Sequence, residues 1–255
     1  MKKNKLYIII SIITINLFIS CVNSSYENKK YIFRYNESSG ITSLDPIFSN
    51  TKSNIWAVNH IFNGLVDLDE NLNIVPSIAK SWEYDEKLLE YRFILRNDVF
   101  FHESDFFKND KKTRRVVASD FIYSFNRIKD DKFSSPGRWV MDYFIDDYPF
   151  QEINDTILVV RLKKPFPSVI NILAMKYFSV VPKEIVENQN FSKNPVGTGP
   201  FKFKYWMDNV KLVLLKNKNY FEFEDSYRLP YLDAINISFI KNPESLFINF
   251  LQSKI

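Results

Sequence analysis

Six short segments rich in apolar residues have the length and composition of β-strands. In the first two, apolar and polar residues alternate, which is the period of a strand with one buried face. Turn-forming residues Ser38, Ser39 and Gly40 follow the first segment. The six predicted strands are residues 31–37, 90–96, 156–162, 201–206, 211–215 and 234–240.

Four other segments repeat apolar residues at the spacing of a helix that packs on a core. They are residues 54–65, 119–129, 168–175 and a last one that begins at Pro243 and runs to the end, with Leu246, Phe247, Phe250 and Leu251 as its apolar stripe. Ser119 and Asp120 are expected to cap the second helix. His60 lies off the stripe of the first, and we interpret it as a partly exposed structural histidine. Strands and helices without regular βαβ alternation predict an α+β (mixed α/β) fold.

The first 20 residues have the layout of a signal peptide. Lys2, Lys3 and Lys5 precede an apolar run, Leu6–Ser20. As a helix this run would reach only about 22 Å, short of the ~30 Å hydrocarbon core of a membrane. A cleaved leader at residues 1–20 is therefore expected rather than a permanent span.

The step into Cys21 resembles a bacterial lipobox, in which the cysteine is lipidated and becomes the new N-terminus. Ser20 fits that pattern, whereas Phe18 and Ile19 depart from it. The alternative is a plain secretory signal with an incidental cysteine. We expect Cys21 to be the lipid anchor, held firmly by its acyl chains, and residues 21–30 to form a polar tether.

Charge and composition exclude several classes of function. The chain has 255 residues, of which 45% are hydrophobic, enough for one or two domains with a real core. Without the leader's three lysines, the chain has 31 basic and 30 acidic residues. It therefore lacks the excess of positive charge that favours nucleic-acid binding. The basic run Lys108–Arg115 is expected to be a solvated loop.

The motifs that usually carry catalysis are also missing from the sequence. One cysteine excludes an intramolecular disulfide, and His60 and His102 lack the spacing of a zinc motif. The five glycines form no phosphate-binding loop, and there is no nucleophile elbow. We therefore expect no metal, no cofactor and no catalysis.

A series of short motifs, specific through their order and spacing, covers nearly the whole exported chain. It resembles solute-binding protein family 5, the oligopeptide and dipeptide receptors of ABC importers. The motifs include Leu44-Asp45-Pro46, Ile61 to Val66, Ser81-Trp82-Glu83, Phe101-His102, Tyr123 to Arg127, Ser135-Pro136, Asn194 to Phe201 and Leu229 to Asp233. One departure is Glu103–Arg115, which we expect to be an altered surface loop.

Several of these motif residues also have structural interpretations. Trp82, Phe93 and Tyr123 are expected in the core. Gly197 and Gly199 are expected at turns that need a positive φ. Arg96 and Asp98 are expected to form a structural ion pair.

The resemblance implies the first lobe of a periplasmic-binding-protein-like type II fold over residues 31–255, with an inserted subdomain at about 54–185. In the family a peptide lies in a cleft between two lobes that close on a hinge. The segment after the Leu-Asp-Pro motif lines that cleft, as do the residues after Ser-Pro. The implied ligand-binding residues are Asn50, Thr51, Lys52, Gly137, Arg138 and Trp139, although Arg138 and Trp139 are also consistent with an exposed loop.

Family members are about twice this long, so the resemblance implies that the second lobe is missing and the chain truncated. If one lobe supplies half of the binding free energy of a micromolar complex, it contributes about −4 kcal/mol, which corresponds to a millimolar dissociation constant. An unpaired strand edge and an exposed apolar face would then reduce solubility.

The resemblance implies that the chain is the substrate-binding component of a peptide ABC importer, and two alternative functions remain open. It would be exported, lipid-anchored at the periplasmic face of a membrane or the cell surface, and bind oligopeptides and permease subunits. The alternatives are a receptor for another solute, such as a nickel chelate, a sugar or a signalling peptide, and a one-lobed surface lipoprotein that mediates adhesion. A hydrolase is the weakest alternative. The sequence leaves open the ligand, the permease and a downstream frame encoding the second lobe.

Overall fold

The computed structural model describes residues 30–252 and 254–255. The chain divides at Lys30 and Tyr31 into two units, and every element below lies in the second unit, Tyr31–Ile255. The expected leader, Cys21 and nearly all of the expected tether lie outside the described residues. Within the described residues, no helix has the length and apolar character needed to cross a membrane.

The first four-stranded sheet joins the two ends of this unit. Its order is β1-β12-β9-β8, with β1 parallel to β12 and the other neighbours antiparallel. One face of the sheet is buried through Leu212, Leu214, Ile235 and Ile237. The strands are β1 (Ile32–Asn36), β8 (Phe201–Met207), β9 (Lys211–Lys216) and β12 (Ala234–Ser238).

The second four-stranded sheet comes from the middle of the chain. It is antiparallel throughout, in the order β4-β5-β7-β6. Its strands are β4 (Ala79–Asp85), β5 (Glu90–Leu95), β6 (Phe150–Asn154) and β7 (Ile157–Arg161). Two small hairpins complete the strands: β2 (Val66–Leu68) with β3 (Ile74–Pro76), and β10 (Phe223–Glu224) with β11 (Tyr227–Arg228).

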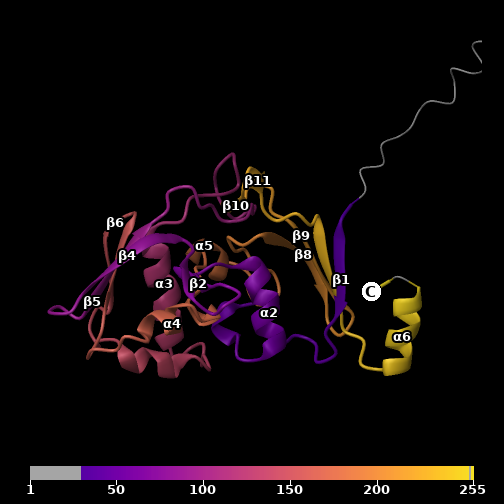
Figure 1. Cartoon of the computed structure of the whole chain (residues 1–255), viewed down its shortest axis with the longest axis horizontal. Coiled ribbons are helices and arrows are strands. Elements are labelled where there is room, and N and C mark those ends of the chain that lie inside the picture. Colours follow the sequence, from indigo (N-terminus) through magenta and orange to yellow (C-terminus); the bar gives the residue numbers. More distant parts are fainter. Residues whose placement is uncertain (1–29, 253) are drawn as a thin grey trace, which may run out of the picture. The chain divides into compact units, whose positions relative to one another are not determined.

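Helices α2 and α3 lie between the two sheets in Figure 1, where α2 contacts β8 and α3 contacts β6. Around α3, the rings of Phe125, Phe150 and Phe178 meet edge to face at about 5 Å, a favourable aromatic geometry. The helices are α2 (Lys52–Ile61), α3 (Ala118–Lys129), α4 (Val169–Leu173), α5 (Lys183–Val186) and α6 (Pro243–Leu251), with short 3₁₀ turns η1 (Pro46–Phe48), η2 (Arg138–Tyr143) and η3 (Lys176–Phe178). The α+β class predicted from the sequence is confirmed.

The first and second predicted helices are both present, but their ends differ from the prediction. Helix α2 stops at Ile61 rather than Leu65, because the Ile61 carbonyl accepts a hydrogen bond of 2.8 Å from the Gly199 amide. The N-cap of α3 is Val117 rather than Ser119 or Asp120. The Asp120 carboxylate accepts from the Val117 amide at 2.9 Å, which places it in the first turn.

The prediction of positive φ at Gly197 and Gly199 is wrong. Among the described glycines only Gly40 has a positive φ, 67°. A Cβ on Gly197 would lie 2.1 Å from the Ile61 oxygen, and one on Gly199 would lie 2.5 Å from the Ile61 carbonyl carbon. These glycines are therefore required by the close approach of two backbone segments.

Other motif residues lie where their structural interpretations place them. Phe93 is fully buried, and Trp82 and Tyr123 are partly buried against the same core. Arg96 donates two hydrogen bonds to Asp98, at 2.9 and 2.7 Å, which confirms the ion pair.

The basic run Lys108–Arg115 is only partly the solvated loop that the sequence predicts. Its residues through Lys112 are exposed, but Arg114 is half-buried. Arg114 pairs with Asp120 at 2.7 Å and also with Glu184. This end of the loop is fixed to α3 and α5, because a partly buried guanidinium that bridges two carboxylates is strongly held.

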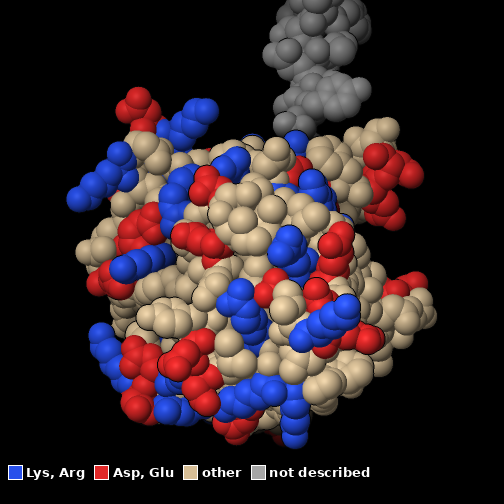
Figure 2. Space-filling model, turned by 90° about the vertical axis from the view of Figure 1, so that its left-hand side faces the viewer, with Lys and Arg blue, Asp and Glu red and all other residues tan. Residues whose placement is uncertain are grey.

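Surface charges of both signs are mixed over the face shown in Figure 2. No extended patch of one sign covers this face, in keeping with the near balance of basic and acidic residues in the sequence.

The edge formed by β1 and α6 has an apolar surface. No side chain of α6 is buried, and Phe247 and Phe250 are each more than 60% exposed. A hollow of about 530 Å³ separates α6 from β1. On β1, which is an edge strand, Phe33 is also exposed.

Candidate functional site

The Leu-Asp-Pro segment is anchored by a buried ion pair. Asp45 caps η1 by accepting from the Ile47 amide at 3.3 Å. The same carboxylate meets the guanidinium of Arg127 on α3 in two hydrogen bonds, of 3.1 and 2.6 Å. Both side chains are at most 4% exposed. A bidentate pair of this kind fixes the position and orientation of η1 on α3.

A second set of hydrogen bonds fixes the start of α2. Thr51 is its N-cap and accepts from the Asn54 amide at 3.3 Å. The buried Asn54 amide group donates to the Thr42 hydroxyl at 2.9 Å and to the Phe48 carbonyl at 3.2 Å. The loop between η1 and α2 is consequently held from both sides.

The three residues at this point present their side chains to solvent. Asn50, Thr51 and Lys52 are all exposed. The Lys52 ammonium lies 4.5 Å from the ring centroid of Trp56, which is itself 48% exposed, a cation–π contact at an accessible surface. An amide, a hydroxyl, a cation and an aromatic face are therefore available over one short stretch of chain.

The second segment, residues 135–139, is attached to the first. The Ser135 hydroxyl donates to the Ile47 carbonyl at 2.7 Å, and the Gly137 amide donates to the Ser135 oxygen at 3.2 Å. Gly137 is buried, and a Cβ there would lie 2.7 Å from the ring of Tyr177. Gly137 is thus the point at which this segment packs on η3.

The residues after Gly137 turn outward at the start of η2. Arg138 pairs with Asp131, and its side chain is 49% exposed. Trp139 is 48% exposed, with its ring centroid 6.4 Å from that of Tyr143. Both side chains are accessible to a ligand.

The structure brings the two predicted groups of residues to neighbouring positions, joined through Ser135 and Ile47. Five of the six side-chain positions are exposed, and only Gly137 is buried. Sequence reasoning did not find the link between Asp45 and Arg127, because 82 positions separate them. Each of the two residues belongs to a family motif, but neither motif indicates that the two side chains are in contact.

Two tyrosines near this region remain neutral over a wide pH range. Burial raises the pKa of Tyr123 to about 12 and also raises the pKa of Tyr177. Within the part of the chain that the structure describes, no group of three or more His, Cys, Asp or Glu side chains is placed to hold a metal ion.

A family profile described as "Bacterial extracellular solute-binding proteins, family 5 Middle" matches residues 73–255. Among curated proteins, this chain is 28% identical over 197 residues to the periplasmic murein peptide-binding protein MppA of Escherichia coli (strain K12). That match covers 71% of this chain and 35% of MppA.

Solved structures show the same fold. The chain matches DppA from Helicobacter pylori, an ABC transporter-associated periplasmic binding protein in complex with the peptide STSA, with a TM-score of 0.76 and 25% identity, over 91% of this chain and 47% of DppA. NikZ from Campylobacter jejuni, in complex with Ni(L-His), matches with a TM-score of 0.72 and 25% identity, over 89% of this chain and 42% of NikZ. The periplasmic-binding-protein-like type II fold is confirmed over the matched region.

The chain spans about a third of the length of the curated relatives it matches, and about half of the length of these solved structures.

Proposed function

Since this chain belongs to the bacterial extracellular solute-binding proteins of family 5, we propose that it contributes to capturing an extracytoplasmic oligopeptide for an ABC importer. The residues proposed to form the ligand-binding site are Asn50, Thr51, Lys52, Gly137, Arg138 and Trp139. The observation that carries the proposal is the hydrogen bond between Ser135 and Ile47, which holds these two segments next to each other. The similarity to DppA, a periplasmic binding protein whose structure is in complex with a peptide, supports the choice of ligand.

The chemistry of the exposed side chains suits a peptide. Arg138, whose Nη1 pairs with Asp131, offers its remaining N–H donors to a carboxylate, and Trp139 offers an apolar face to a side chain. Asn50 offers an amide that both donates and accepts hydrogen bonds, as a peptide backbone does. Gly137 is buried, with its amide donating to Ser135 and its carbonyl accepting from Val140, so in this site it would position Arg138 and Trp139.

A surface that contacts a peptide from one side gives a weak complex. Tight sites for small ligands enclose most of the ligand's surface, whereas Arg138 and Trp139 are about half exposed. For the 255-residue chain we therefore expect a dissociation constant in the millimolar range, which corresponds to a binding free energy of about −4 kcal/mol.

The test is a titration of the chain with mixed tripeptides, followed by nuclear magnetic resonance. Replacing Trp139→Ala or Arg138→Gln should weaken binding about threefold to tenfold, by loss of an aromatic or charged contact. The control is Tyr148→Ala, an aromatic residue that is 77% exposed and outside the two segments. Equal binding by all variants would refute the assignment of the site.

A second solute class is favoured by the similarity to NikZ, whose structure is described in complex with Ni(L-His). The same titration should therefore include a nickel–histidine chelate beside the peptides. Binding of the chelate at the same residues, with no effect from peptides, would replace the peptide proposal by a receptor for another solute. Failure of both ligands would favour the alternative of a surface lipoprotein with an adhesive role.

We also propose that the protein is exported and anchored through a lipid on Cys21, where it would meet permease subunits at the membrane. The support is the lipobox-like step into Cys21 and the description of relatives as periplasmic. In cells, Cys21→Ser should move the protein from the membrane fraction to the soluble fraction, because the acyl chains provide the anchor. Unchanged membrane association of the variant would contradict this proposal.

A further inference from the structure

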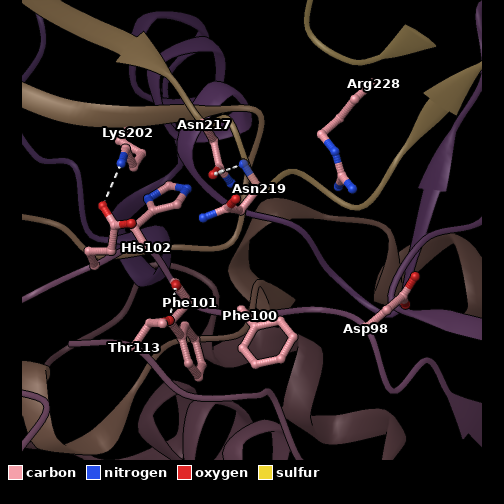
Figure 3. A pocket seen from close by; sticks show the side chains of 10 residues that line it. Asp98, Phe100, Phe101, His102, Thr113, Lys202, Asn217, Asn219 and Arg228 are labelled. Atoms are coloured by element: carbon pink, nitrogen blue, oxygen red, sulfur yellow. Dashed lines mark hydrogen bonds and ion pairs between the residues drawn. The ribbon is translucent and has the colours of Figure 1, made fainter. Parts of the chain in front are cut away.

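A separate pocket lies beside the β10–β11 hairpin, outside the two segments proposed to contact peptide. It has a volume of about 320 Å³, at the lower end of the range for small-molecule sites. Residues from five stretches of the chain line it, among them Phe100, His102, Lys202, Asn219 and Arg228. Figure 3 shows Lys202 and Arg228 on opposite sides of the hollow, with Asn219 between them and Phe100 below.

The base of the pocket is rigid. His102 and Asn217 are at most 5% exposed. The imidazole Nε2 lies 2.9 Å from the Gly199 carbonyl oxygen, and the Asn217 amide group donates to the same oxygen at 3.0 Å. Because these side chains are bonded to one loop, a ligand would meet a base that is already formed.

The two carboxylates that line the pocket are each neutralised by a cation. Asp98 is held by two hydrogen bonds from Arg96, at 2.9 and 2.7 Å. Glu103 pairs with Lys202 at 2.8 Å. The hydrogen bonds from Arg96 lower the pKa of Asp98, with a smaller effect from the nearby Arg228. Neither carboxylate therefore leaves an uncompensated negative charge in the pocket.

Arg228 is the lining cation whose charge is not balanced in this way. Among residues 30–252 and 254–255, no carboxylate oxygen lies within 4.0 Å of its guanidinium. Its Nη1 donates to the Tyr220 carbonyl, and its guanidinium carbon lies 4.4 Å from the ring centroid of Phe223. These contacts orient the guanidinium, and its other N–H groups remain available to a carboxylate.

The remaining lining groups provide an apolar wall and a polar one. The Phe100 ring is 44% exposed, although it lines a concavity. The side-chain amide of Asn219 makes no hydrogen bond within the described part of the chain, although its backbone amide donates to Asn217. A ligand with a flat apolar body would stack on Phe100, and one polar substituent of that ligand would form a hydrogen bond with Asn219.

We propose that this pocket is a second ligand site, which binds a small planar monocarboxylate through Arg228, Asn219 and Phe100. Arg228 would receive the carboxylate, and Phe100 would contact the body of the ligand. This site goes beyond the proposed peptide capture and uses none of its residues.

The test uses 4-fluorobenzoate as the probe, observed by ¹⁹F nuclear magnetic resonance with the 255-residue chain. We expect saturable binding, weakened about tenfold or more in Arg228→Gln, through loss of a charge-assisted contact. The unmodified chain should bind the neutral analogue 4-fluorobenzamide more weakly than 4-fluorobenzoate, by a similar factor. The matched control is Arg92→Gln, an arginine on β5 with a side chain that is 50% exposed and outside the pocket.

Arg228 is exposed on a short hairpin, so its replacement leaves the buried core intact. Asn219→Ala provides a second variant in the same pocket and should weaken binding of 4-fluoro-3-hydroxybenzoate, whose hydroxyl is the polar substituent for Asn219, more than binding of 4-fluorobenzoate. Excess tripeptide should not displace the probe, which keeps this result separate from the outcome of the peptide titration. Equal affinity for Arg228→Gln and the unmodified chain, equal binding of the amide, displacement by peptide or absence of saturable binding would each overturn the proposal.

Discussion

His102 contacts the Gly197–Gly199 loop through both ring nitrogens. Its Nδ1 accepts from the Gly197 amide at 3.4 Å, and its Nε2 faces the Gly199 carbonyl at 2.9 Å. This arrangement requires a neutral ring with the proton on Nε2. Burial is the main cause that lowers the pKa of His102 to about 4.

Stability should therefore fall as the pH decreases from about 6.5 to 4. In that range the unfolded chain binds a proton at His102 before the folded chain does, so acid favours unfolding. The full effect for one such histidine is roughly 3 kcal/mol in the free energy of unfolding. Urea unfolding at several pH values measures it, and His102→Gln should flatten the dependence.

His60 is the matched control, because burial also lowers its pKa to about 4. His60→Gln should remove a separate part of the pH dependence and leave the contribution of His102. A His102→Gln variant that kept the whole dependence would contradict this account.

Gly197 provides a second prediction at the residue scale. A Cβ there would lie 2.1 Å from the Ile61 oxygen, so Gly197→Ala must displace backbone. We expect a loss of about 1–3 kcal/mol in the free energy of unfolding, which thermal or urea unfolding measures. Gly40→Asn is the control, because Asn tolerates a positive φ and a Cβ there meets nothing within 4 Å. Equal losses at both positions would contradict the close-approach explanation.

At the scale of elements, η1 depends on α3. The buried pair of Asp45 and Arg127 is the contact that joins them. Arg127→Met would leave the Asp45 carboxylate buried without its partner, at a cost of about 3–5 kcal/mol in stability. Replacing both, with Asp45→Asn beside Arg127→Met, should recover part of that loss. Urea unfolding of the unmodified chain and these two variants tests this, and a loss under about 1 kcal/mol for Arg127→Met would contradict it.

The local pattern predicted the elements with strong periodicity and missed those that depend on neighbours. All six predicted strands are present within a residue or two. Strand β4 was not predicted, because its run AKSWEYD has few apolar residues and it is an edge strand. Helix α6 has the predicted apolar stripe, yet none of its side chains is buried. Periodicity marks a face that is able to pack, without identifying what it packs against.

At the scale of the whole molecule, the fold class and the family could be predicted, but the sheet order could not. Strand β1 pairs with β12 across about 200 positions, as with Ile32 and Ala234, and no local pattern reports such a pairing. The β4-β5-β7-β6 sheet is inserted in the chain between β1 and β8, and no local pattern reports this insertion either. The domain boundaries and the six site residues remain predictions, carried by the resemblance and supported by the exposure of five of them.

The most direct test of the proposed function maps the peptide on the chain. Amide chemical shifts of the isotopically labelled 255-residue chain would be followed during titration with a tripeptide to millimolar concentration. We expect saturable shifts confined to residues 46–52 and 135–139, with the amides of Lys52 and Trp139 among them. Shifts located elsewhere, or saturable binding without shifts in these two segments, would contradict it.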